Sequence, residues 1–164
     1  MKKLIGLIVV VAAAIYGVGY FMLSEDSAKK TLDEMDAMLI DGKGEELCDY
    51  LHDDVQIAVT SDMGGQTSSI NGGKKEFCDY LKQAGGAMAV MKGQMDIKVE
   101  RTNFKTERDW LHPWTATYTY DESTSISIPA SGQSMSNQSK GTTTLVMTLK
   151  GVKVLNASSQ PAGA

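Results

Sequence analysis

Apolar and polar positions along the chain predict helices in its first half and mostly strands in its second half. An apolar run without any charged residue comes first, from Leu4 to Leu23. Apolar residues then recur at helical spacing, at Ala28, Leu32, Met35 and Leu39. A short helix is predicted over 45–51 and a third helix over 74–84, which Gly85-Gly86 is expected to end.

The spacing changes to two where strands are expected. Val55, Ile57 and Val59 alternate with polar or small residues, which predicts a half-buried strand, a turn over 62–65 and a return strand over 66–70. Further strands are predicted over 95–99, 114–120, 142–149 and 152–157, the last two joined by a tight turn at Lys150-Gly151. The polar stretch 131–141 is predicted to be a mobile loop. Helices segregated from an antiparallel sheet indicate an α+β fold.

The leading apolar run predicts a membrane segment. Twenty residues at about 1.5 Å each make about 30 Å, the thickness of the hydrocarbon core of a bilayer. Lys2 and Lys3 precede the run and are expected to stay in the cytoplasm, so the rest of the chain is exported. Residues 1–23 are therefore either a transmembrane signal anchor or a cleaved signal peptide with an apolar core over 4–16 and small residues at Gly17 and Gly19.

A short signal led by lysines is typical of bacteria, which places the chain in the inner membrane with its C-terminal domain in the periplasm, or free in the periplasm if the signal is cleaved. The predicted division is residues 1–23 as anchor or signal, 24–157 as one domain, and 158–164 as a flexible tail. A length of 164 residues fits one such domain.

Composition narrows the possible partners. The formal net charge is −4, and removing Lys2 and Lys3 with residues 1–23 leaves −4 − 2 = −6. An acidic chain is a poor partner for nucleic acid, because binding a phosphate backbone needs clustered Lys and Arg. Two Cys and two His are too few for a zinc site with four protein ligands unless carboxylates contribute. We expect no metal and no cofactor.

Three segments, read in order, resemble the nuclear transport factor 2-like, or SnoaL-like, superfamily. They are "LIDGKGEELCDYLHDDVQIAV", "INGGKKEFCDYLKQ" and "TLVMTLKGVKVLNAS", which match a helix pair before an x-D-V strand, a G-K-x-x-F helix start and a last hairpin with a glycine turn. The resemblance covers residues 28–157. It implies a cystatin-like α+β barrel, a cone-shaped curved antiparallel sheet packed on about three helices around a pocket. Dimerisation through the sheet is also implied. Members include isomerases, dehydratases, cyclases, ligand-binding domains and secretion scaffolds, so no single function follows.

Cys48 and Cys78 lie thirty residues apart, on the apolar sides of two predicted helices. In an oxidising compartment they are candidates for a disulfide, which would stabilise the fold by about 3–4 kcal/mol. The alternative is two separate buried thiols.

The segment from Asp109 to Trp114 holds the most unusual residues. Asp109 and His112 are candidate acid–base groups if the protein is an enzyme. Trp114, Tyr118 and Tyr120 are expected on one face of one strand, as ligand-binding residues or as core or dimer-interface aromatics.

A second histidine stands beside carboxylates, at His52-Asp53-Asp54. The cluster is either a tuned acid–base group or, as we favour, a solvated helix end.

These observations suggest a membrane-tethered periplasmic domain without catalytic activity, which binds a small apolar ligand or a protein partner. Its membrane contact would be residues 4–23, and its partner a second copy or another membrane protein. The alternative is a pocket enzyme, a lyase or isomerase, with Asp109 or His112 as base.

Overall fold

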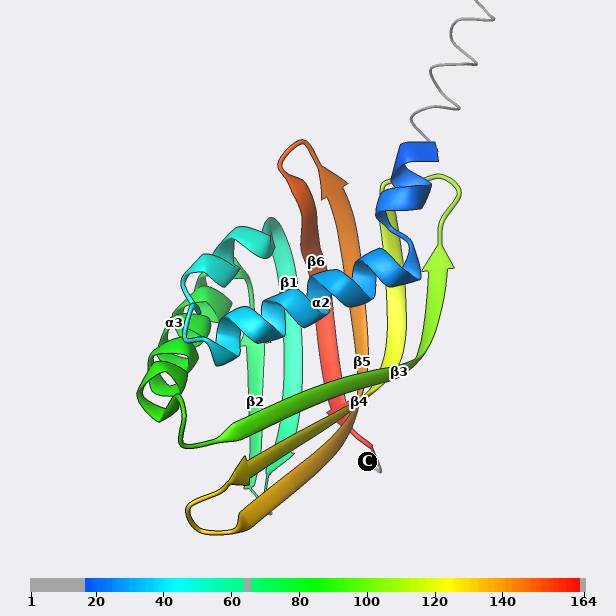
Figure 1. The fold of residues 1–164 in the computed structure, drawn as a ribbon. Helices are drawn as coiled ribbons and strands as arrows, with labels where there is room; N and C mark the ends of the chain where they lie inside the picture. Colours follow the sequence, from blue (N-terminus) through cyan, green and yellow to red (C-terminus); the bar gives the residue numbers. More distant parts are fainter. Residues whose placement is uncertain (1–16, 64–65, 163–164) are drawn as a thin grey trace, which may run out of the picture.

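A computed structural model describes residues 17–63 and 66–162 and confirms the predicted α+β fold (Figure 1). One six-stranded sheet has the strand order β2-β1-β6-β5-β4-β3. Its helices lie on the concave side of the sheet, where α2 crosses the strands (Figure 1). The elements follow in the order α2 (Glu25–Ile40), η1 (Glu46–Tyr50), β1 (Leu51–Met63), β2 (Gln66–Gly72), α3 (Lys74–Met91), β3 (Asp96–Arg108), β4 (Thr115–Ile128), β5 (Gln133–Thr148) and β6 (Gly151–Pro161).

The sheet is antiparallel except where its first and last strands meet. β6 pairs antiparallel with β5 on one side and parallel with β1 on the other. β3, β4 and β5 bend around α2 (Figure 1). The register of β3 against β4 shifts between Thr102 and Lys105, and Asn103 there has a φ of 55°, a left-handed conformation that asparagine tolerates better than most residues. The bulge gives the sheet its curvature at this point.

The first predicted stripe forms the buried side of α2. The Oγ of Ser24 accepts a hydrogen bond from the backbone N–H of Ser27 at 3.3 Å and caps the helix. Ala28 and Leu32 are fully buried, and Met35 and Leu39 pack against the same core. The helix is therefore fixed by its sequence pattern as well as by its cap.

The predicted end of the third helix at Gly85-Gly86 is wrong, because α3 continues to Met91. Gly85 is buried against the loop before η1, and a Cβ at this position would lie 2.6 Å from the backbone nitrogen of Gly44. These glycines permit a close approach of two backbone segments instead of ending a helix.

Two polar stretches predicted to be a loop and a tail are strands. β5 begins at Gln133, so most of the predicted loop 131–141 pairs with β4. β6 extends to Pro161, and Ser158 pairs with Thr142 of β5 and with Ala58 of β1. Backbone hydrogen bonds to neighbouring strands hold these segments, so few apolar side chains are needed.

The predicted membrane segment falls largely outside the described residues. Residues 17–22 are helical and Leu23 is buried. Within 17–63 and 66–162, no helix has the length and apolar character needed to cross a bilayer.

Candidate functional site

The concave face of the sheet, beneath α2, is the place where this architecture can hold a site, and two predicted tyrosines lie there. Tyr118 is completely buried, and its hydroxyl donates a hydrogen bond to the carbonyl oxygen of Leu23 at 2.5 Å. Tyr120 stacks on Phe104 with 5.1 Å between ring centroids, and its hydroxyl lies 2.9 Å from the Oγ1 of Thr143. Both tyrosines belong to one continuous apolar core with residues of α2, η1 and α3.

Trp114 does not share this face. It lies in the turn before β4, which begins at Thr115, and its residue is 36% exposed. Its backbone carbonyl accepts a hydrogen bond from the N–H of Met147 at 2.8 Å. The alternation predicted over 114–120 therefore holds for the tyrosines, while Trp114 precedes the strand and is partly exposed.

Arg101 brings a buried positive charge to the same inner face. Its residue is only 8% exposed, and its guanidinium lies 2.5 Å from Asp36 and 3.4 Å from Asp33, both on α2. On the neighbouring strand, Glu122 is 2.9 Å away, and the guanidinium carbon lies 5.5 Å from the centre of the Tyr120 ring. The Nε atom of Arg101 has no hydrogen-bond partner within the described part of the chain. This ionic cluster fastens α2 to β3 and β4.

Burial alters the acid–base behaviour of the groups in this layer. Burial raises the pKa of the Glu122 carboxyl, and the nearby charge of Arg101 only partly offsets the effect. Burial also raises the pKa of Tyr118 to about 12. Burial raises the pKa of Tyr120 as well, although its hydrogen bond with Thr143 acts in the opposite direction and lowers the pKa. Both phenols are therefore protonated at neutral pH, and the Tyr118 hydroxyl acts as a hydrogen-bond donor.

The predicted acid–base pair lies elsewhere, on the exposed loop between β3 and β4. The Nδ1 of His112 is 2.8 Å from the Oδ2 of Asp109, and more than half of each side chain is exposed. The other carboxylate oxygen of Asp109 accepts the backbone N–H of Leu111 at 2.9 Å. That hydrogen bond first, and then the one from His112, lowers the pKa of the Asp109 carboxyl. The pair is placed to fold its own loop, away from Tyr118 and Tyr120.

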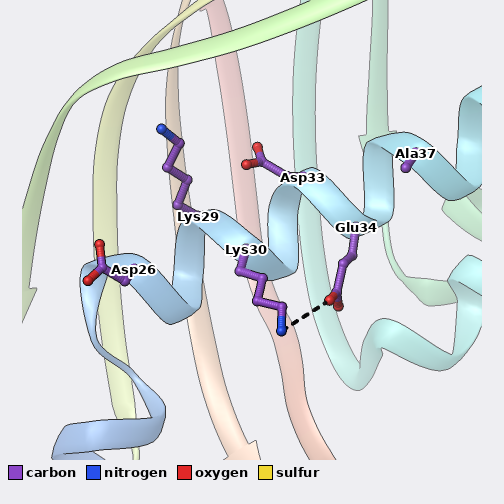
Figure 2. A pocket seen from close by; sticks show the side chains of 6 residues that line it. All are labelled: Asp26, Lys29, Lys30, Asp33, Glu34 and Ala37. Atoms are coloured by element: carbon purple, nitrogen blue, oxygen red, sulfur yellow. Dashed lines mark ion pairs between the residues drawn. The ribbon is translucent and has the colours of Figure 1, made fainter.

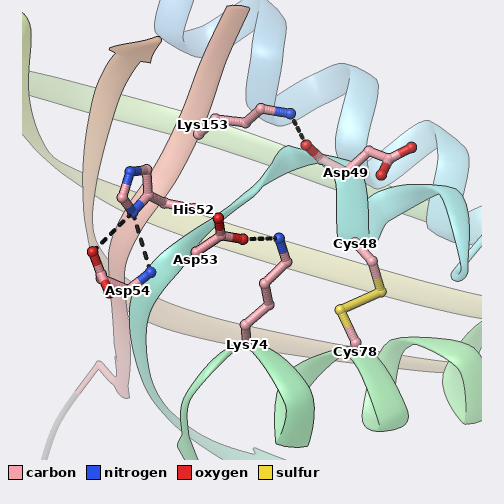
Figure 3. A network of polar contacts seen from close by, with 8 residues as sticks. All are labelled: Cys48, Asp49, His52, Asp53, Asp54, Lys74, Cys78 and Lys153. Atoms are coloured by element: carbon pink, nitrogen blue, oxygen red, sulfur yellow. Dashed lines mark hydrogen bonds and ion pairs between the residues drawn. A yellow bond between two sulfur atoms is a disulfide. The ribbon is translucent and has the colours of Figure 1, made fainter. Parts of the chain in front are cut away.

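The second histidine cluster lies on β1, so the expected helix end is wrong (Figure 3). His52 accepts a hydrogen bond from the backbone N–H of Asp54 at 3.2 Å. Asp53 forms a 2.7 Å ion pair with Lys74 at the start of α3. The Asp53–Lys74 ion pair connects β1 to α3 at the surface.

Cys48 and Cys78 form a disulfide that joins η1 to α3 (Figure 3). Their Cα atoms are 5.5 Å apart, within the usual range for such a bond. The predicted apolar sides of the two helices therefore face each other.

A shallow hollow runs along the solvent side of α2 (Figure 2). Its lining residues all come from that helix and carry charges of both signs, with Lys30 and Glu34 3.8 Å apart. Six residues line it: Asp26, Lys29, Lys30, Asp33, Glu34 and Ala37. Nothing converges there from a second element, so we assign it no chemistry. In the described part of the chain, no group of three His, Cys, Asp or Glu is arranged to hold a metal ion.

The alternation of apolar residues on β3 contained a signal for the position of Arg101. Arg101 continues the two-residue alternation of Ile97 and Val99, so it falls on the same face of β3. Extending that alternation would have placed Arg101 on the inner face. Its partners on α2 could not be identified, because they depend on how the helix crosses the sheet.

No model of a known protein family matches the chain, and no curated protein matches it in sequence. Solved structures do match. The beta subunit of benzoate 1,2-dioxygenase from Burkholderia mallei is 10% identical with a TM-score of 0.68, over 85% of this chain and 91% of that chain. A nuclear transport factor 2-like protein with a cystatin-like fold from Novosphingobium aromaticivorans is 15% identical with a TM-score of 0.55, over 87% and 93%.

ActVI-ORFA from Streptomyces coelicolor is 6% identical with a TM-score of 0.63, over 84% of this chain and 96% of that chain. The domain therefore has the nuclear transport factor 2-like fold, as its sequence resemblance implied. This is a fold that can hold a ligand between its sheet and its helices. Identities this low concern the fold and leave the activity to be argued from the site.

Proposed function

We propose that the chain is a non-catalytic domain, tethered to a bacterial inner membrane, that binds a protein partner in the periplasm. One observation carries this proposal: the aromatic side chains of the inner face, where a substrate would bind, are buried within the chain's own core. Tyr118 and Arg101 lie buried there, with the Tyr118 hydroxyl hydrogen-bonded to Leu23 and the Arg101 guanidinium paired with Asp36. A small ligand would have to displace Tyr118 or Tyr120 from the core, at the cost of their packing and hydrogen bonds.

The positions of Asp109 and His112 do not support the alternative of an enzyme. Asp109 and His112 were its candidate base, and both lie on an exposed loop. General acid–base chemistry requires the group within hydrogen-bond reach of a bound substrate. Asp109 and His112 therefore give no support to a lyase or isomerase activity.

Two features support the periplasmic location. The apolar run from Leu4 to Leu23 follows two lysines, the order expected for a segment that enters the membrane from the cytoplasm. The disulfide between Cys48 and Cys78 favours an oxidising compartment.

The outer face of the sheet is the surface we assign to the partner, which we take to be a second copy. Its centre carries uncharged hydroxyl side chains in facing pairs, where Thr117 and Thr144 lie 2.9 Å apart and Thr119 is paired with Thr142. Uncharged, short side chains on a sheet permit close face-to-face packing against an equal surface.

Light scattering of the full-length protein in detergent tests whether the partner is a second copy of the chain. The wild type should be a dimer, and Thr144→Lys should be a monomer, because it places a charge in the centre of the face. Ser136→Lys is the matched control: it lies on the same strand at an exposed position and should leave the dimer intact. A monomeric wild type would contradict the dimer.

Binding of small apolar probes tests the filled interior. Neither benzene nor indole should raise the melting temperature of the wild type in a saturable way. Leu32→Ala is the positive control, since removing this buried side chain beneath α2 creates a cavity that such probes can enter. Saturable binding of one probe molecule by the wild type would contradict this proposal and would favour a domain that binds a small apolar ligand.

A further inference from the structure

Exposed apolar side chains gather at one end of the domain. Among the described residues, eleven large hydrophobic side chains are exposed, and eight belong to residues 18–22, to the β3–β4 loop or to the β5–β6 turn. Figure 1 shows these three segments at the same end of the domain. The eight are Val18, Tyr20, Phe21, Met22, Trp110, Leu111, Trp114 and Leu149. So strong a concentration indicates a surface that is covered in the functional protein.

Direct contacts hold the segment 17–23 against the β3–β4 loop. Arg108, the last residue of β3, donates hydrogen bonds to the carbonyl oxygens of Tyr20 and Leu23. Its guanidinium carbon also lies 4.2 Å from the centre of the Tyr20 ring. Gly19 packs against the backbone of Pro113, where a Cβ would lie 2.7 Å from the carbonyl oxygen. The two segments are therefore in direct contact.

The Asp109–His112 pair shapes the tip of that loop. Both Asp109 oxygens are used within the loop, one by the N–H of Leu111 and one by the His112 ring. The closed turn presents Trp110 and Leu111 outward, with 76% and 61% of each residue exposed. The pair thus positions an apolar tip.

The chain leaves no spacer between this end and the predicted membrane segment. The apolar run ends at Leu23, which is buried in the domain, and Ser24 already caps α2. Because Gly19, Tyr20 and Leu23 contact the domain, only the earlier part of the apolar run can lie within the bilayer. If that part enters the membrane, this end of the domain must meet the headgroup region. Tryptophan and tyrosine favour that region, and arginine and lysine near it extend their charges to water.

We propose that the β3–β4 loop enters the lipid headgroup–acyl boundary through Trp110 and Leu111 and fixes the tilt of the domain on the membrane. This inference rests on the proposed tether. The occupant of the apolar surface is a lipid bilayer because the surface is continuous with the apolar run. The acidic balance of the exported part, −6, is consistent with a contact made by apolar side chains and not by charge.

Tryptophan fluorescence of the full-length protein in vesicles tests the proposal, since Trp110 and Trp114 are the only tryptophans. Trp114→Phe leaves Trp110 as the sole reporter, and Trp110→Phe leaves Trp114. Vesicles of phosphatidylethanolamine and phosphatidylglycerol would carry acyl chains brominated near the headgroup. Trp110 should lose more than half of its emission in these vesicles, and its spectrum should shift to shorter wavelength. Trp114, which is less exposed, should be quenched less.

Flotation of the same vesicles separates two kinds of failure. If the protein does not float with the lipid, the tether itself is wrong. If it floats but Trp110 emits as in water, the tether stands and the proposed insertion is overturned. A Trp110 spectrum that is shifted but not quenched by bromine means that protein covers the loop, which also overturns it. Leu111→Asn should reduce the quenching of Trp110, and no reduction would count against the proposal.

Discussion

Replacing Arg101 with methionine should destabilise the domain through charge, since the side-chain volume is nearly kept. Removing one partner of a buried ion pair costs about 3–5 kcal/mol. Here the carboxylates left behind are partly solvated, with Asp33 50% and Glu122 23% exposed at the side chain, so we expect about 2–3 kcal/mol. For a domain of this size that corresponds to a fall in Tm of about 4–12 °C.

The loss should depend on pH in a definite direction. A carboxyl whose pKa is raised by folding binds its proton more tightly in the folded state, so stability rises as the pH falls through that pKa toward the unfolded value. Arg101 opposes the raised pKa of Glu122, and without it the pKa rises further. The deficit of Arg101→Met should therefore be larger at pH 8 than at pH 5.

Urea unfolding, followed by circular dichroism at pH 5 and pH 8 in the absence of reductant, measures the loss of unfolding free energy in Arg101→Met. Lys98→Met is the matched control, because Lys98 lies on the same strand and pairs at 2.5 Å with Glu100 in an exposed setting. It should leave the unfolding free energy unchanged within error. Equal losses for both variants, or a deficit independent of pH, would refute the assignment of a buried ionic cluster.

Three further outcomes follow from the packing. Replacing both Cys48 and Cys78 with serine should lower the unfolding free energy by about 3–4 kcal/mol in chemical denaturation, and an unchanged midpoint would mean the bond is absent. Gly86→Ala should raise the unfolding free energy by about 0.5–1 kcal/mol, because its Cβ meets open space. Gly85→Ala should lower the unfolding free energy, because its Cβ would lie 2.6 Å from the backbone nitrogen of Gly44. Thermal melts in which Gly85→Ala is the more stable variant would contradict this packing. Absorbance at 295 nm should show Tyr118 ionising only near pH 12, and stability should fall from about pH 10 to pH 12, where the unfolded chain releases this proton first. Tyr118→Phe should reduce both effects, and the remainder should come from Tyr120, whose pKa is also raised by burial.

Local patterns in the sequence were sufficient for the elements whose stability is local. The stripe from Ala28 to Leu39 predicted α2, and alternation predicted most strands. The strand at Ser158 was missed because small polar residues have no periodic signal, and only its two neighbouring strands make it a strand. Gly85 was misread for a similar reason: its close contact is with a distant segment.

The candidate site was harder to predict because it depends on tertiary placement. Tyr118 and Tyr120 were correctly placed on one face of a strand, since alternation determines which face a residue occupies. The burial of Arg101 and its pairing with Asp36 depend on the path of α2 across the sheet. The outward position of Asp109 and His112 depends on a closed loop whose conformation no periodicity reports.

Protease accessibility in spheroplasts tests the central claim of a tethered domain outside the cytoplasm most directly. The full-length chain with a C-terminal epitope would be produced in a Gram-negative host. We predict that it stays in the membrane pellet after alkaline carbonate extraction, and that protease removes the epitope from spheroplasts but not from intact cells. An epitope protected in spheroplasts, or a chain released into the soluble fraction, would contradict the account.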